Sequence, residues 1–125
     1  SYSFYIALSY LQLNEFSKAN EIFQKDILAQ EKQFGNAHHL DLFYYGITKY
    51  EQGKWEEAII EFDKSLKEYS NFSDAQFYKA ICLARIGKKE EAIQVMEKSR
   101  NDFKNGYTIN EDNAIYETYP YKVRF

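Results

Sequence analysis

A five-residue motif occurs three times in this chain of 125 residues, and its spacing strongly limits the possible folds. The motif consists of Phe-Tyr, any residue, a small residue and a branched apolar residue, and it begins at Phe4, Phe43 and Phe77. Twelve residues after the small residue of each copy stands an alanine: Ala19, Ala58 and Ala92. The copies are therefore 39 and then 34 residues apart. Periods in this range are typical of solenoids built from short helices.

The second copy shows most clearly how each unit is expected to fold. Its second half carries apolar side chains three and four residues apart, as on the buried face of a helix: Trp55, Ala58, Ile59, Phe62 and Leu66. An earlier helical stripe ends near Gly53, and the equivalent positions in the other copies are Asn14 and Gly87. Glycine and asparagine tolerate the left-handed backbone conformation that ends a helix sharply. Each copy is therefore predicted to be a helical hairpin.

Small residues stand at equivalent positions on both helices of every hairpin. The first helices carry Ala7, Gly46 and Ala80, and the second helices carry the three alanines that follow twelve residues later. Such residues let two backbones cross closely, because a larger side chain would hold the helices apart. We therefore expect a substitution that enlarges one of these residues to overpack the crossing.

These features resemble the tetratricopeptide repeat family, whose units are helix-turn-helix hairpins of 34 residues. The resemblance covers about residues 1–103 and includes the small position, the hinge and the later alanine. It also includes an aromatic residue after the turn and a later large residue: Phe16 and Trp55, then Phe23, Phe62 and Met96. It implies an all-α fold, a right-handed α-solenoid of three hairpins with a short irregular or partly helical C-terminal cap.

The predicted domain organisation follows from these boundaries. Residues 1–106 form one domain, residues 107–125 form a tail or cap, and the repeats span about 1–36, 39–70 and 73–104. The first copy is five residues longer than the family period, which predicts an extended second helix followed by a loop. The single Cys82 falls on the core pattern, where it is expected to act as a small apolar side chain.

The resemblance implies a concave groove lined by the first helices of the hairpins. Its predicted peptide-binding residues are Phe4, Tyr5, Leu8, Phe43, Tyr44, Ile47, Tyr50, Phe77, Tyr78, Ile81 and Arg85. An aromatic and apolar groove suits an extended peptide or an amphipathic helix with hydrophobic anchors. Family members that dock chaperones present lysine, asparagine and arginine to grip a terminal carboxylate, and this chain has apolar residues there. An alternative is that the Phe-Tyr pairs serve only to pack one repeat against the next.

The tail permits two interpretations. Residues 110–117 have the composition of a short helix, and the surrounding segment is rich in aromatic and aliphatic residues. A solenoid needs its last hydrophobic face covered, so the tail is expected to act as a degenerate cap. The alternative is that the tail lies in an aromatic groove, its own or that of a neighbouring molecule, as an internal ligand or a dimer clasp.

Catalysis, a cofactor and a metal site are not expected. The only histidines are the adjacent His38 and His39, and the chain lacks a glycine-rich phosphate loop and paired zinc-binding cysteines. The net charge of −3 and the scattered basic residues argue against nucleic-acid binding, although base stacking on the tyrosines keeps RNA as a remote alternative. No stretch of the sequence has the length and apolarity of a membrane span.

The sequence therefore predicts a non-catalytic protein-protein interaction module that binds a peptide or helix segment in its concave groove. The alternative function is a structural or self-association element of a larger assembly, in which the tail acts as a clasp and forms a homo-oligomer. The first copy of the motif begins three residues after Ser1, which indicates a fragment or a processed form. The compartment and the identity of the partner cannot be predicted from the sequence.

Overall fold

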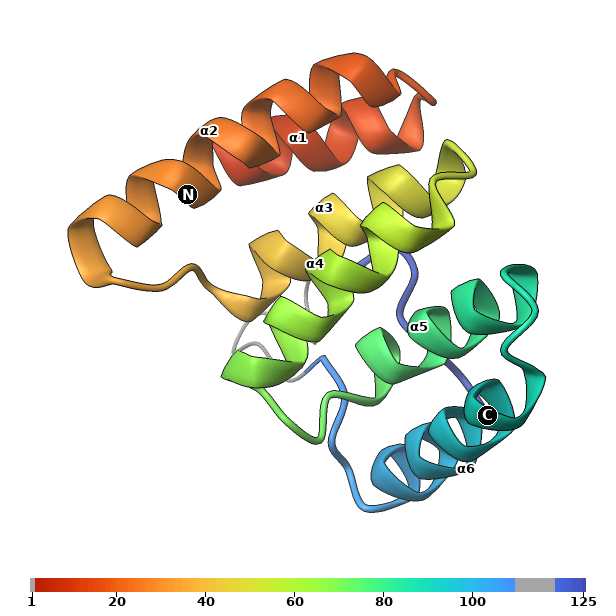
Figure 1. The fold of residues 1–125 in the computed structure, drawn as a ribbon. Helices are drawn as coiled ribbons and strands as arrows, with labels where there is room; N and C mark the ends of the chain where they lie inside the picture. Colours follow the sequence, from red (N-terminus) through yellow and green to blue (C-terminus); the bar gives the residue numbers. More distant parts are fainter. Residues whose placement is uncertain (1, 110–118) are drawn as a thin grey trace.

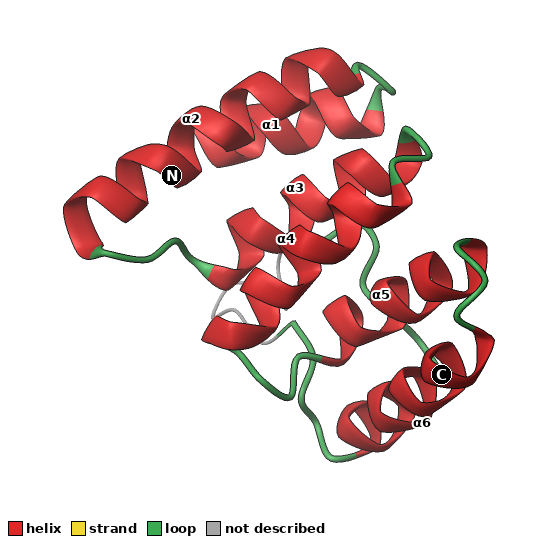
Figure 2. Ribbon diagram, viewed as in Figure 1, coloured by secondary structure: helices red, strands yellow, loops and turns green. Residues whose placement is uncertain are grey.

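A computed structural model describes residues 2–109 and 119–125, and that part of the chain is all-helical, without strands (Figure 2). The six helices are α1 (Tyr2–Gln12), α2 (Phe16–Phe34), α3 (His39–Glu51), α4 (Trp55–Glu68), α5 (Ser73–Arg85) and α6 (Lys89–Lys104). Each helix packs against its neighbours in the chain, so that three hairpins stack side by side (Figure 1). Helix α1 also contacts α3, and α3 contacts α5, which makes α1, α3 and α5 one layer of the stack.

The hinges between the paired helices adopt the conformation that the sequence predicts. Asn14, Gly53 and Gly87 have φ angles of 61°, 74° and 86°, all in the left-handed region. Glycine adopts this region without strain, and asparagine is among the few other residues that enter it readily. The hairpin prediction is confirmed, and so is the extended second helix of the first copy, because α2 has 19 residues whereas α4 has 14.

The helix crossings are as close as the small residues indicate. A Cβ atom built on Gly46 of α3 would lie 2.7 Å from the Phe62 ring of α4, far inside van der Waals contact. The alanines at equivalent positions are buried in all three hairpins. Cys82 is also fully buried, as predicted, and burial raises the pKa of its thiol to about 12. The thiol therefore stays protonated near neutral pH.

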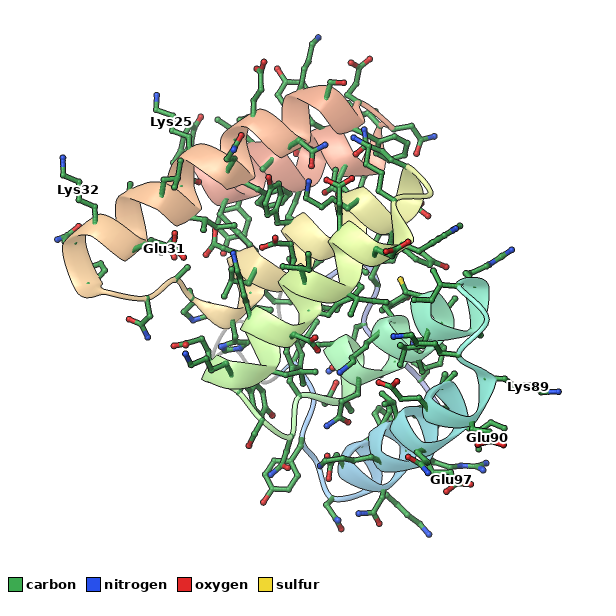
Figure 3. All side chains as sticks on the ribbon, in the orientation of Figure 1. Lys25, Glu31, Lys32, Lys89, Glu90 and Glu97 are labelled. Carbon is green, nitrogen blue, oxygen red and sulfur yellow. The ribbon has the colours of Figure 1, made fainter. Side chains whose placement is uncertain are left out.

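The outer layer of the stack is charged and faces away from the core. Charged side chains extend outward from α2 and α6, including Lys25, Lys32, Lys89, Glu90 and Glu97 (Figure 3). None of the described helices is both long enough and apolar enough to cross a membrane.

The joint between the second and third hairpins contains a partly buried histidine that makes stability depend on pH. The ring of His39 packs edge-on against Tyr69 and Phe72, with ring centroids 5.0 and 5.2 Å away. Burial first, and the neighbouring His38 second, lower the pKa of His39 to about 4. Since the unfolded chain has a histidine pKa of about 6.5, folding favours the neutral ring. This stabilisation is present above about pH 6.5 and is lost as the pH falls toward 4.

We therefore expect His39→Gln to flatten the pH dependence of stability between pH 6.5 and 4. The measurement is the urea midpoint of the wild type and of the variant at several pH values. His38 contributes the smaller part of the shift, so His38→Gln is the neighbouring control and should leave most of the slope in place. Equal slopes for the wild type and His39→Gln would contradict this role of the His39 ring.

Candidate functional site

The C-terminal segment of residues 119–125 lies along the inner layer of helices. It passes behind α3 and α5, on the side opposite to α4, and ends near α6 (Figure 1). Five side chains of α3 and α5 make hydrogen bonds or ring contacts with this segment: Tyr44, Glu51, Asp74, Phe77 and Tyr78. We call the surface that they form the α3–α5 groove. Three of these five residues are predicted groove residues, and Glu51 and Asp74 extend the lining.

Tyr44 is positioned by α3 to hold the main chain of the segment. Its ring is fully buried among Phe4, Phe23 and Phe43, and its hydroxyl donates a hydrogen bond of 2.8 Å to the carbonyl oxygen of Pro120. Burial raises the pKa of the Tyr44 hydroxyl, so the group remains a donor throughout the physiological range. The Tyr44 ring therefore packs in the core, whereas its hydroxyl oxygen contacts the segment in the groove.

Tyr44→Phe is therefore expected to keep the core packing and to remove one contact with the segment. The net effect on the free energy of unfolding should be about 0.5–1.5 kcal/mol, because water can solvate the released carbonyl of Pro120. Urea unfolding measures this change. Tyr10→Phe, on the half-buried face of α1, is the matched control and should cost less. An equal effect of both variants would contradict the contact between Tyr44 and Pro120.

Asp74 in the first turn of α5 is the second main-chain anchor, and its side chain is fully buried. Its Oδ2 atom accepts a hydrogen bond of 2.8 Å from the backbone N–H of Val123, and its Oδ1 atom accepts one of 2.6 Å from the hydroxyl of Thr108. Burial raises the pKa of the Asp74 carboxyl, although these hydrogen bonds oppose the shift. The helix N-terminus also favours a carboxylate here. Asp74 thus ties residues 107–109 and the C-terminal segment to α5.

The sequence prediction missed Asp74, although a signal for it was present. Asp74, Phe77, Tyr78 and Ile81 are spaced as one helical stripe, so a carboxylate stands on the stripe that was assigned to the groove. The residue was overlooked because an acidic side chain in the first turn of a helix is ordinarily a solvated capping group. Its burial depends on residues 107–109, which lie more than 30 positions away in the sequence.

Aromatic contacts fix the side chains of the segment. The ring of Tyr121 lies 5.7 Å from that of Tyr78, and its hydroxyl donates a hydrogen bond of 2.6 Å to Glu51 Oε2. The ring of Phe125 lies 5.6 Å from Phe77 and 5.4 Å from Phe103 of α6. Burial raises the pKa of Tyr78 to about 12 and also raises that of Tyr121. Both phenols are therefore neutral and available as donors.

The structure places the other predicted groove residues in three different surroundings. Phe43 and Ile47 are completely buried and Leu8 nearly so, which leaves them in the core rather than on an open surface. Tyr50 packs between Trp55 and Tyr78, Arg85 stacks 5.3 Å over the Trp55 ring, and Ile81 is half-buried. Phe4 and Tyr5 border a recess of about 280 Å³ whose described lining also includes Tyr119. Tyr5 is exposed, at 42%, and Arg85 is also exposed.

The described part of the tail lies on the inner layer and also reaches α6. Residues 119–125 contact α3 and α5, and Phe125 also contacts Phe103 of α6. The cap and the internal ligand both stay predictions. The short helix predicted at residues 110–117 lies outside the described residues. Within the described ranges, no group of three His, Cys, Asp or Glu side chains is arranged to hold a metal ion.

A family model described as tetratricopeptide repeat matches residues 2–25, 42–71 and 74–106. These segments make up more than half of the chain, and each lies on one of the three hairpins, the first ending within α2. The chain therefore belongs to the tetratricopeptide repeat family. Repeats of this family form protein-protein interaction scaffolds that are generally non-catalytic, and their partners are other proteins.

Solved structures of MamA, another tetratricopeptide repeat protein, share this fold. MamA MSR-1 in a C2 crystal form has a TM-score of 0.73 at 20% identity, over 83% of this chain and 57% of that chain. MamA AMB-1 in a P212121 form has a TM-score of 0.70 at 21% identity, over 82% and 58%. A MamA mutant has a TM-score of 0.69 at 20% identity, over 94% and 59%. The chain thus spans less than two thirds of these structures, and no curated protein matches it.

Proposed function

We propose that this chain is a non-catalytic interaction module whose concave groove binds a segment of a partner polypeptide. The observation that carries the proposal is the α3–α5 groove, which holds residues 119–125 partly through their peptide groups. Tyr44 donates to a carbonyl, Asp74 accepts from an amide, and both contacts are available to any polypeptide of suitable shape. The aromatic rings beside them supply pockets for side chains.

The exposed and half-exposed groove residues add to this support. Tyr5 of the first repeat and Tyr78 of the third stand at equivalent positions and retain accessible surface along the inner layer, as does the neighbouring Phe77. Aromatic side chains provide much contact area for little loss of conformational entropy, which is why they dominate binding surfaces. The proposed binding surface therefore runs from the recess at Tyr5 to the ring of Phe77.

Selection from a displayed library of random peptides tests this function. The full-length chain is expected to enrich peptides that no longer bind a groove variant carrying Tyr5→Ala, Glu51→Lys and Phe77→Ala. The matched control is Leu28→Ala with Phe34→Ala, because both side chains are exposed on α2. Circular dichroism must show that both variants remain folded. Peptides that bind the groove variant as well as the wild type would contradict the proposal, as would a failure to enrich any peptide.

A structural or self-association role is the second candidate, and one observation favours it. The groove side chains of Phe43 and Ile47 are used entirely for packing, and the α3–α5 groove is filled by the chain itself. A neighbouring copy could supply the same segment. Light scattering during size-exclusion chromatography separates the two functions: the interaction module predicts a mass near 14.9 kDa at all concentrations. Self-association would be favoured if the mass doubled as the protein concentration rises and if Tyr121→Ala with Phe125→Ala returned it to the mass of one chain.

A further inference from the structure

The backbone of the C-terminal segment is strained where it enters the groove. Tyr121 follows Pro120 in a turn and has a φ angle of 65°, in the left-handed region. A bulky residue is less stable in this region than in the ordinary conformation, because its Cβ atom approaches the following carbonyl oxygen too closely. Such strain persists only where the surroundings hold it, and here Glu51 and Tyr78 of the groove do so. A segment with a relaxed turn at this position would bind the same contacts more favourably.

Charge also distinguishes the segment from the groove. The segment carries two basic side chains, Lys122 and Arg124, and no acidic one between Tyr119 and the C-terminus. The groove presents the carboxylates of Glu51 and Asp74. The Lys122 ammonium donates to the carbonyl oxygen of Ile109, 2.9 Å away, and its positive charge favours the ionised form of Asp74. A basic side chain at this position is therefore complementary to the Asp74 carboxylate.

We propose that residues 119–125 are a resident ligand of the α3–α5 groove, which a partner segment of the same pattern displaces. This inference rests on the proposed function, since it names the chemistry of the segment that the groove takes. The pattern is a carbonyl at the position of Pro120, a tyrosine directly after it, a free amide at the position of Val123 and an aromatic residue two positions later. Basic residues stand between these points. The tyrosine hydroxyl has to be unmodified, because it donates a hydrogen bond of 2.6 Å to Glu51 Oε2.

Fluorescence anisotropy with a synthetic peptide of residues 118–125 tests the inference. The receptors are the full-length wild type and a tail variant, Tyr121→Ala with Phe125→Ala, which weakens the resident segment and leaves the groove intact. The peptide should bind the tail variant about tenfold more tightly, because the resident segment reduces the fraction of open groove in the wild type. Leu28→Ala with Phe34→Ala, on α2, is the matched control and should bind as the wild type does.

Modified peptides test the recognition of the tyrosine. A peptide with phenylalanine in place of Tyr121 lacks one hydrogen bond and should bind about fivefold more weakly. A phosphotyrosine peptide should bind more weakly still, because its phosphate faces the Glu51 carboxylate. Introducing Glu51→Gln into the tail variant should narrow the gap between the tyrosine and phosphotyrosine peptides. If the tail variant does not fold, the single Tyr121→Phe chain replaces it and should gain about fivefold in peptide affinity over the wild type.

Three outcomes overturn the inference. They are equal affinity of the wild type and the tail variant, equal binding of a scrambled peptide, and equal binding of the tyrosine and phosphotyrosine peptides. The proposed function fails separately. If library peptides bind the groove while the peptide of residues 118–125 does not, the resident-ligand inference falls and the interaction function stands. If no peptide binds the folded tail variant, both fall.

Discussion

Asp74→Ala is expected to release the C-terminal segment from the groove and to lower the free energy of unfolding by roughly 1–3 kcal/mol. The buried carboxylate accepts hydrogen bonds from the Val123 amide and the Thr108 hydroxyl, and alanine leaves both donors without this acceptor. Removing a desolvated charge offsets part of the cost, since burial raises the pKa of Asp74. Urea unfolding measures the stability, and amide hydrogen exchange at Val123 reports the release.

Asp74→Asn separates the two roles of this side chain. The asparagine keeps an oxygen that can accept from Thr108, but its amide nitrogen is a donor and cannot accept from the Val123 N–H. We therefore expect Asp74→Asn to retain most of the stability while the Val123 amide loses its protection. If Val123 stays protected in both variants, the segment is held by something other than the Asp74 carboxylate.

Gly46→Ala is expected to destabilise the second hairpin by about 1–3 kcal/mol, although alanine ordinarily favours a helix over glycine. The new methyl group would lie 2.7 Å from the Phe62 ring, which is itself completely buried and cannot move aside freely. The helices must separate or the ring must leave its preferred position. Urea unfolding of the two proteins measures the cost.

A double-mutant cycle with Phe62→Leu tests the cause of this effect. Leucine is smaller than phenylalanine, so the methyl group of Gly46→Ala should cost much less in the Phe62→Leu background. If Gly46→Ala alone caused no loss of stability, this result would contradict the close crossing of α3 and α4. Loss of stability of equal size in both backgrounds would place the strain elsewhere.

The hairpins were predictable because their determinants are local. The left-handed hinges at Asn14 and Gly53 require particular residue types at single positions, and the crossing at Gly46 requires a small one. Each of these requirements recurs once per repeat, so the three copies reinforce one another in the sequence. The extended α2 followed from the same spacing, since five extra residues had to be accommodated between two hinges.

The groove was less predictable because its composition depends on what packs against each helix face. A helical stripe shows that Phe43, Ile47 and Tyr78 share a side of their helices, but it does not say which neighbour covers them. In the structure, Phe43 and Ile47 are covered by adjacent helices, whereas Tyr78 meets the C-terminal segment. Tyr44 belongs to both environments at once, with a buried ring and a hydroxyl that contacts Pro120. Such a division is visible only in three dimensions.

The placement of residues 119–125 could not be predicted for a related reason. Its contacts join positions 70 and 76 apart in the sequence, from Glu51 to Tyr121 and from Tyr44 to Pro120. A short aromatic segment is equally compatible with a cap and with a ligand, because both interpretations require only exposed apolar side chains. The groups that decide where the segment lies are the Asp74 carboxylate and the Tyr44 hydroxyl. They bind main-chain atoms of the tail, so the side-chain composition of the tail does not indicate these contacts.

Hydrogen exchange of the Val123 amide in the full-length chain tests most directly whether the α3–α5 groove binds polypeptide main chain. The N–H donates to a buried carboxylate 2.8 Å away, so it should exchange far more slowly than the same amide in an unstructured peptide. Adding a peptide that binds the groove should make this exchange fast while the amides of α3 stay protected. A Val123 amide that already exchanges at the unstructured rate in the wild type would contradict the occupied groove.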